Sequence, residues 1–304
     1  MPDRPVGYKT IKYDMLFRSG ERDPYYHMLD DRMIFIGGSG RSGTSWLGKV
    51  IGSCAYVYYD YEPFTFKIAL IMGMPRELLY TFVFEGCALP CLLGQHVNFM
   101  YDPALDISGH NYISDLEIAD WNDKKHNRYD DMEELIERKD PFKRVAIKHI
   151  DITPYYSMLL NTFKGSQIVH IVRNGNDVIA SSLKLNWFTD ERYAFDFGWP
   201  GWVDDLSQFL KFKPATRAAV TWRTMNDPCF LKDINCMRYE DIMPDDSHML
   251  DIPGELGLQE TVNTKRHMSD FKPVDHYPSV LDEIEQPERD KFCEMMEYWK
   301  YDVS

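Results

Sequence analysis

The segment "FIGGSGRSGTSWLGKVIG", residues 35 to 52, constrains the fold more than any other part of the sequence. It is typical of a buried strand that runs into a glycine-rich turn and then into a helix, the arrangement that binds phosphate groups in many proteins. Gly38 and Gly43 enclose four residues, as in the Walker pattern, but Thr44 and Ser45 follow where that pattern has a lysine. The segment therefore predicts an anion site that departs from the usual nucleoside triphosphate loop.

The chemistry of this loop favours a short anionic group. Backbone N–H groups of Ser42, Gly43, Thr44 and Ser45 would surround an anion at the start of the helix, where the helix dipole adds about 0.3–1 kcal/mol. The nearby cation is Arg41, inside the loop. A nucleoside triphosphate needs positive charge at its β and γ phosphates and usually Mg²⁺, whereas this loop offers one guanidinium and hydroxyl groups.

Short β-rich runs recur between helical segments, at 33–38, 55–60, 144–150, 167–174 and 234–240. This alternation predicts an α/β protein with a three-layer, P-loop NTPase-like fold, in which helices flank a central parallel sheet. In such sheets ligands bind beyond the carboxyl ends of the strands. We therefore expect convergence of the polar residues that lie at or after strand ends, which are Arg41, Glu62, Lys148, His149, Arg173 and Tyr239.

The length of 304 residues and the hydrophobic content of 44% fit one domain that spans residues 1–304. Two long segments interrupt the alternation of strands and helices. We interpret residues 64–140 as a helical or irregular cap inserted over the sheet, and residues 186–206, which are rich in aromatic and turn residues, as a lid-like loop.

Charge and composition restrict the partners and the location. With 34 basic and 48 acidic residues the net charge is −14, which repels nucleic acid. The N-terminal segment carries charges throughout, and charged residues interrupt the apolar stretch at 68–93, so we expect neither a signal peptide nor a membrane span and a cytoplasmic location. The six cysteines lack the spacing of metal ligands, so we expect no metal site.

A second motif, "VRNGNDVIASS" at 172–182, completes the pattern. Arg173 ends a predicted strand, and Ser181 follows eight residues later on the next predicted helix. Such a pair can hold a second phosphate away from the first. Together with the loop, this motif resembles the sulfotransferases that use 3′-phosphoadenosine 5′-phosphosulfate (PAPS), in particular bacterial enzymes that act on small molecules.

The resemblance implies a set of nucleotide-binding residues. The family motif (R/K)SGT(T/S)x, which binds the 5′-phosphosulfate, appears here as Arg41-Ser42-Gly43-Thr44-Ser45-Trp46, directly after Gly40. The 3′-phosphate pair appears as Arg173 and Ser181. Trp46 resembles the tryptophan that stacks on adenine. Tyr239, in the Tyr239-Glu240-Asp241 segment that the family carries on a later strand, resembles the tyrosine that contacts adenine.

A third family element departs from its usual form. Where the family has Arg-Lys-Gly before Gly-Asp-Trp-Lys, this chain has Thr264-Lys265-Arg266 before Ser269-Asp270-Phe271-Lys272. The resemblance implies that Lys265 and Arg266 meet the 3′-phosphate. The missing first arginine and glycine imply that this loop lies differently.

The resemblance also implies a mechanism that requires no metal. An SO₃ group passes in line from the leaving phosphate to the acceptor, so positioning and charge stabilisation dominate. Arg41 would stabilise charge on the leaving group, as the arginine of tyrosylprotein sulfotransferases does at this position. Glu62, 21 residues after Arg41, matches the spacing of their catalytic glutamate, and we favour it as the base over His149, which lies near the histidine base of cytosolic members. Lys148 is either a surface lysine or a ligand of the sulfuryl oxygens.

For the acceptor we expect a hydroxyl or an amine on a small molecule. The acidic chain favours a cationic acceptor, and a guanidinium alkaloid of specialised metabolism is our hypothesis; it disfavours the acidic peptides that protein-tyrosine sulfotransferases modify. Two other readings stay open. One is a P-loop kinase or NTPase that acts on a small molecule, and the other is a nucleotide-binding scaffold without catalysis.

Overall fold

Five parallel strands form the central sheet in the order β2-β3-β1-β4-β5. The computed structural model describes residues 30–55, 57–61, 144–150, 152–189, 206–242, 250–271 and 276–303. The strands are β1 (Met33–Gly37), β2 (Val57–Tyr61), β3 (Arg144–Lys148), β4 (Gln167–Val172) and β5 (Asn235–Arg238). All five predicted strands form, and the predicted α/β class is confirmed.

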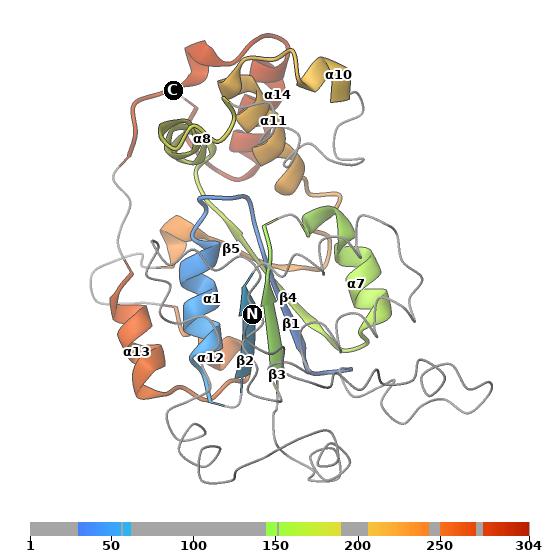
Figure 1. The fold of residues 1–304 in the computed structure, drawn as a ribbon, viewed down its shortest axis with the longest axis vertical. Coiled ribbons are helices and arrows are strands. Elements are labelled where there is room, and N and C mark those ends of the chain that lie inside the picture. The colour runs from blue at the N-terminus through green and yellow to red at the C-terminus, as the bar shows by residue number, and fades with distance from the viewer. Residues whose placement is uncertain are drawn as a thin grey trace, which may run out of the picture.

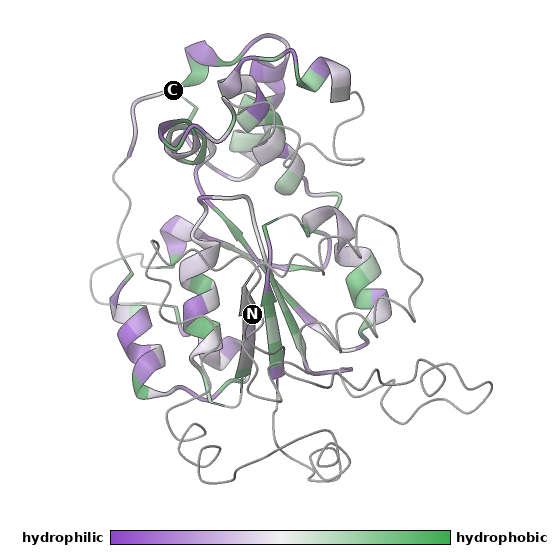
Figure 2. Ribbon diagram, viewed as in Figure 1, coloured by the Kyte–Doolittle hydropathy of each residue, from purple (hydrophilic) through white to green (hydrophobic). Residues whose placement is uncertain are grey.

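Helices surround this sheet. The α-helices are α1 (Thr44–Gly52), α7 (Tyr156–Thr162), α8 (Gly175–Lys184), α10 (Leu206–Phe209), α11 (Pro214–Met225), α12 (Ile252–Glu255), α13 (Val262–Ser269) and α14 (Glu288–Tyr298). Three short 3₁₀ helices are η6 (Thr153–Tyr155), η7 (Tyr239–Asp241) and η8 (Leu281–Glu283). Figure 2 shows apolar strands at the centre and helices of mixed polarity around them.

The sheet is covered on both faces, because its strands are apolar on both sides. On one face Ile34 and Ile171 pack with Leu47 and Ile51 of α1 and with Ile252 of α12. Figure 1 shows α1, α12 and α13 on this side and α7 on the other. On the α7 side, the rings of Phe35 in β1 and Phe163, just after α7, lie 5.6 Å apart. This is the three-layer arrangement expected from the sequence.

A separate group of helices, α8, α11 and α14, lies beyond the carboxyl ends of the strands (Figure 1). Its core contains Trp222 of α11 and Phe292 of α14, whose ring centroids are 5.3 Å apart, and it includes Val172, the last residue of β4. The helix that follows β4 is thus held against α11 and α14 rather than against the sheet.

Strand β1 lies at the centre, with β3 on one side and β4 on the other. The connection after β1 leads through α1 to β2 on one side of the sheet, and the connection after β3 leads through α7 to β4 on the other side. The carboxyl ends of β1 and β3 therefore lie at a topological switch point, where such folds bind ligands. Among the described residues, no helix combines the length and the apolarity needed to cross a membrane. The predicted cap at 64–140 and most of the predicted lid at 186–206 lie outside the described residues.

Candidate active site

The loop between β1 and α1 has the backbone of an anion-binding turn. Gly38 has φ 141°, and a Cβ there would lie 2.4 Å from the carbonyl oxygen of Ile171 on β4, so the loop passes close to the neighbouring strand. Gly43 has φ 93° and precedes α1. Arg41 also has a left-handed φ of 69°, which costs a non-glycine residue about 1–2 kcal/mol. Strain of this kind concentrates at functional sites.

No side chain caps the N-terminus of α1, and no acidic residue in its first turn offsets the positive end of the helix dipole. The residue at the N-cap is Gly43. By contrast, α8 begins with Asn174, whose side chain accepts hydrogen bonds from the backbone of Asn176 and Asp177, and its first turn carries the Asp177 carboxylate. The α1 terminus is therefore the one that can attract an anion at the centre of the sheet.

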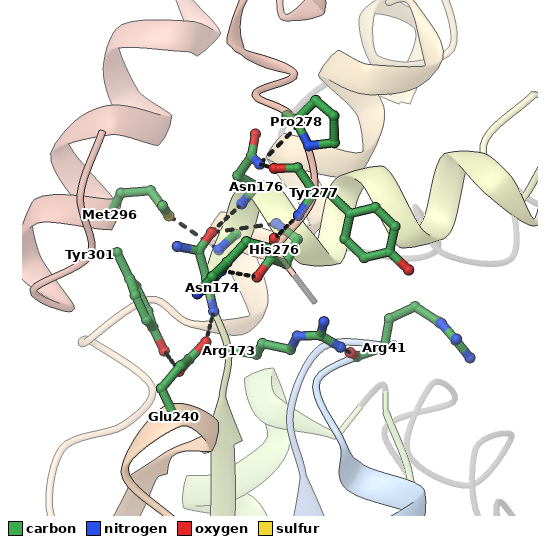
Figure 3. Close-up of polar contacts among 12 residues, drawn as sticks. Arg41, Arg173, Asn174, Asn176, Glu240, His276, Tyr277, Pro278, Met296 and Tyr301 are labelled. Carbon is green, nitrogen blue, oxygen red and sulfur yellow. Dashed lines mark hydrogen bonds and ion pairs between the residues drawn. The ribbon is translucent and has the colours of Figure 1, made fainter. Parts of the chain in front are cut away.

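The two motifs that the sequence separates by more than a hundred residues meet at this loop. The exposed Arg41 donates from Nε to Oγ of Ser181 over 3.1 Å. Arg173 donates from Nη1 to the carbonyl oxygen of Arg41 over 3.0 Å, and Figure 3 shows its side chain directed at the Arg41 backbone. The Nε of Arg173 is buried and has no hydrogen-bond partner among the described residues. Arg173 therefore contacts the backbone of the loop, and the Arg41 side chain contacts Ser181 on α8.

An aromatic cluster, composed of Trp46, Tyr239 and Phe271, adjoins the loop. Trp46 donates from Nε1 to the carbonyl oxygen of His267 over 2.8 Å and packs edge-on against Phe271 at 4.7 Å. Tyr239 lies 4.8 Å from Phe271, and the Arg173 guanidinium lies 5.3 Å over the Tyr239 ring. Burial raises the pKa of Tyr239, which favours its neutral form. The three rings thus form an aromatic surface beside the loop.

The expectation that Tyr239-Glu240-Asp241 lies on a strand is wrong. Strand β5 ends at Arg238, and the three residues form η7. The turn brings Tyr239 over the loop, where a Cβ added to Gly43 would lie 2.4 Å from its ring. If β5 continued through Tyr239, the tyrosine side chain would point to one face of the sheet and not over the loop.

Lys148 and His149 lie at the end of β3, beside β1. The backbone N–H of His149 donates to the carbonyl oxygen of Ile36 over 3.0 Å. His149 is 4% exposed and Lys148 is 1% exposed, so the reading of Lys148 as a surface lysine is wrong. Lys148 pairs in register with Tyr61, the last residue of β2. Glu62, the next residue, lies outside the described residues.

Lys265 and Arg266 lie on α13 and not in a loop. The helix begins with a capping box between Thr261 and Thr264, and the hydroxyls of both residues donate to the carbonyl oxygen of Ser53 at the end of α1. Both basic side chains are exposed, and Nζ of Lys265 lies 3.8 Å from a carboxylate oxygen of Glu260. Their contact with a 3′-phosphate stays a prediction.

Sequence reasoning did not assign Trp187 and Phe271 to the site. The Arg41 guanidinium carbon lies 5.8 Å from the Trp187 ring centroid, and a Cβ added to Gly40 would lie 2.7 Å from that ring. Trp187 comes six residues after Ser181, close enough in sequence to suggest the contact. Phe271 stands where the family motif has a tryptophan, and that aromatic replacement was the available signal.

Among the described residues, no group of three or more His, Cys, Asp or Glu side chains could hold a metal ion. Arg41 and Arg173 bring positive charge to the carboxyl edge of the sheet, where the nearby Glu240 carboxylate accepts from the backbone N–H of Asn174. The site therefore suits an anionic ligand.

Comparison with known proteins adds evidence on the fold. No protein-family model matches the sequence, and no curated protein matches it significantly. The solved sulfotransferase domain from the curacin biosynthetic pathway superposes with a TM-score of 0.50 at 14% identity, covering 91% of this chain and 99% of that domain.

Two other solved structures are similar over most of the chain. They are the sulfotransferase domain from the Synechococcus PCC 7002 olefin synthase (TM-score 0.45, 17% identity, 90% of this chain and 95% of that chain) and sulfotransferase STF9 from Mycobacterium avium (0.46, 13%, 90% and 78%). The match to the curacin domain extends over nearly the whole of both chains. This chain therefore has the sulfotransferase fold.

Proposed function

We propose that this protein is a sulfotransferase that moves the sulfuryl group of PAPS to a hydroxyl or amine of a small-molecule acceptor. The observation that carries the proposal is the meeting of Arg41, Arg173 and Ser181, with the 3.1 Å hydrogen bond from Arg41 to Ser181 and the 3.0 Å bond from Arg173 to the loop. One nucleotide with phosphates on both its 5′ and 3′ positions would use both parts of this arrangement.

The described residues fit such a nucleotide in three respects. The α1 terminus has no capping side chain and no acidic residue in its first turn, so its amides can receive the 5′-phosphosulfate. The buried Nε of Arg173, without a partner among the described residues, is a donor that a phosphate oxygen would satisfy. The cluster of Trp46, Tyr239 and Phe271 provides aromatic rings suited to stacking on adenine.

Bound PAPS would supply an activated sulfuryl group with a phosphate as its leaving group. The Arg41 guanidinium would serve as an electrostatic stabiliser of the leaving phosphate and not as a proton donor. The Arg41 side chain is held by its hydrogen bond to Ser181 and by the Trp187 ring, whose centroid lies 5.8 Å from the guanidinium carbon. Backbone amides at the start of α1 would share the negative charge that grows on the leaving group.

A base must remove the acceptor's proton. We keep Glu62 as that base, on its spacing from Arg41, and His149 as the alternative, because His149 follows β3 directly beside the end of β1. Lys148 is buried at the end of β3, directly before His149 in the sequence, and its register partner is Tyr61, the residue before Glu62. These positions support a role for Lys148 at the sulfuryl oxygens.

Ligand binding distinguishes this proposal from a kinase. Thermal unfolding should shift upward with adenosine 3′,5′-bisphosphate, because ligands that bind only the native state stabilise it. A shift with ATP·Mg²⁺ alone would reject the sulfotransferase and favour a kinase. Binding of the bisphosphate without turnover on any acceptor would favour a non-catalytic nucleotide-binding protein.

The acceptor requires a direct screen. The protein, PAPS and a panel of phenols, sterols, sugars and cationic alkaloids would be incubated, and sulfated products identified by mass. The net charge of −14 leads us to expect the cationic members to react best. Reaction of neutral phenols or sterols alone would reject the cationic acceptor and keep the enzyme class.

A further inference from the structure

Tyr301, near the C-terminal end of the described chain, contacts the turn that carries Arg173. It follows α14 and is 7% exposed. Its hydroxyl lies 2.7 Å from Oε2 of Glu240 and 3.3 Å from the carbonyl oxygen of Val172. The shorter distance is that of a charge-assisted hydrogen bond, so the hydroxyl donates chiefly to the Glu240 carboxylate.

Glu240 connects Tyr301 to the N-terminus of α8. Its other carboxylate oxygen, Oε1, accepts a 2.9 Å hydrogen bond from the backbone N–H of Asn174, the residue after Arg173. Asn174 is the N-cap of α8, and its side chain accepts from the backbone of Asn176. Figure 3 shows the chain of contacts from Tyr301 through Glu240 to Asn174, with Arg173 leading from it toward Arg41.

The backbone on both sides of Arg173 is therefore fixed by side chains from elsewhere in the chain. Trp222 donates from Nε1 to the carbonyl oxygen of Arg173 over 3.1 Å. The preceding carbonyl, of Val172, lies near Tyr301, and the following amide, of Asn174, donates to Glu240. These contacts fix the backbone position of Arg173, and from this position its side chain reaches the loop between β1 and α1.

Electrostatics keep the Tyr301 hydroxyl a donor. Burial raises the pKa of Tyr301, and the neighbouring Glu240 carboxylate raises it further. The Arg238 guanidinium lies 4.5 Å over the Tyr301 ring and pairs with Asp241 at 3.6 Å, so a cation balances the acidic groups of η7. The raised pKa keeps the phenol protonated at neutral pH, so its hydroxyl can donate to Glu240.

We propose that Tyr301 is a positioning residue for recognition of the 3′-phosphate: through Glu240 it fixes the turn from which Arg173 reaches the nucleotide. This inference rests on the proposed function, because it assigns Arg173 to the 3′-phosphate. Tyr301 itself touches no part of the loop between β1 and α1 in the contacts described above. Because Arg173 meets the loop only through one hydrogen bond to the Arg41 carbonyl, the effect of Tyr301 should be larger for ligands that carry a 3′-phosphate than for those that do not.

The test compares two nucleotides by calorimetric titration. Adenosine 3′,5′-bisphosphate engages both phosphate sites, whereas adenosine 5′-phosphate lacks the group that Arg173 would bind. Tyr301→Phe removes one oxygen and keeps the ring. We expect it to weaken bisphosphate binding about fivefold, the effect of one net hydrogen bond, and to change 5′-phosphate binding less than about twofold.

Two further variants make the test specific. Glu240→Gln keeps one acceptor oxygen where two are needed, so it should weaken bisphosphate binding to a similar extent. The double variant should lose little more affinity than either single variant, because both substitutions break the same chain of contacts. Tyr298→Phe is the matched control, since Tyr298 is 59% exposed on α14, and it should bind both nucleotides as the wild type does.

Three results would overturn the positioning role. They are unchanged bisphosphate binding by Tyr301→Phe, equal losses for both nucleotides, and additive losses in the double variant. If Tyr301→Phe does not fold, Glu240→Gln and its ratio of affinities for the two nucleotides decide the question alone. Failure of the proposed function looks different, because the wild type itself would then bind the bisphosphate no better than the 5′-phosphate, and the positioning role would fall with it.

Discussion

The Nε of Arg41 donates a hydrogen bond to Oγ of Ser181 over 3.1 Å, although 140 residues separate them. Ser181 is 4% exposed, so this hydrogen bond involves a buried hydroxyl. The residue assigned to the 5′-phosphosulfate thus contacts the residue assigned to the 3′-phosphate. A nucleotide that binds Arg41 or Ser181 must therefore compete with the hydrogen bond between them.

The Ser181→Ala variant should reveal this contact. Loss of the hydroxyl removes the proposed 3′-phosphate ligand and the partner of Arg41. We therefore expect weaker bisphosphate binding and also lower turnover at saturating PAPS, each by roughly threefold to tenfold. Steady-state kinetics separate kcat from KM. A rise in KM with unchanged kcat would show that Ser181 serves binding alone. Ser207→Ala, on the exposed face of α10, is a suitable control.

Arg173→Ala should weaken cofactor binding before it affects chemistry. A hydrogen bond to a charged group contributes about 1.5–3 kcal/mol, which corresponds to roughly a 10-fold to 100-fold loss of affinity for adenosine 3′,5′-bisphosphate. Calorimetric titration measures that loss directly. Lys232→Ala removes an exposed charge elsewhere and should have no effect. Equal losses in the two variants would point to net charge instead of a specific contact.

Gly43 and Gly257 provide a matched pair for the loop. Both have positive φ, at 93° and 66°, but a Cβ on Gly43 would meet Tyr239 whereas a Cβ on Gly257 would meet nothing within 4 Å. We expect Gly257→Ala to lower the free energy of unfolding by about 1–2 kcal/mol with unchanged nucleotide affinity. Gly43→Ala should be less stable and lose roughly tenfold in affinity, because it displaces an aromatic ring of the site. Urea unfolding and titration measure the two effects.

Patterns that are local in the sequence predicted much of the fold and part of the site. The strands and the loop were recognisable because buried parallel strands are continuous apolar runs and because the loop glycines have fixed spacing. The contacts of Glu240 with Asn174 and Tyr301 were not, since they join residues 66 and 61 positions apart without any repeat or motif. The burial of Lys148 also escaped prediction, because a lysine at a strand end usually reaches water and only the strands beside it decide otherwise.

The choice of base can be tested by substitution. Glu62→Gln should keep bisphosphate affinity and lose turnover by roughly 10²–10⁴-fold, because the acceptor's proton then has no base. His149→Ala is the comparison, since His149 follows β3 beside the loop strand. Full activity of Glu62→Gln together with an inactive His149→Ala would transfer the role to the histidine. Binding titrations on both variants show that any loss lies in the chemical step.

Stability should depend on pH through His170, a fully buried residue of β4. The Asn226 side chain donates from Nδ2 to the carbonyl oxygen of Trp222, so its Oδ1 accepts from Nε2 of His170 over 3.0 Å. Nδ1 of His170 then accepts from the Tyr156 hydroxyl over 2.8 Å. Burial, which disfavours the charged ring, lowers the pKa of His170 from 6.5 to about 4, and the hydrogen bond with Asn226 opposes this shift only in part.

Above pH 6.5 the ring is neutral in both states, and the native state keeps its full stability. Between pH 6.5 and about 4 His170 is protonated in the unfolded chain but neutral in the native protein. The free energy of unfolding therefore falls with falling pH, by roughly 3 kcal/mol in total. Urea unfolding at pH 7, 5.5 and 4.5 measures this slope. His170→Gln should be less stable at pH 7 but flatter across the window, because no imidazole remains to titrate. An equally steep slope in the variant would assign the acid sensitivity to other groups.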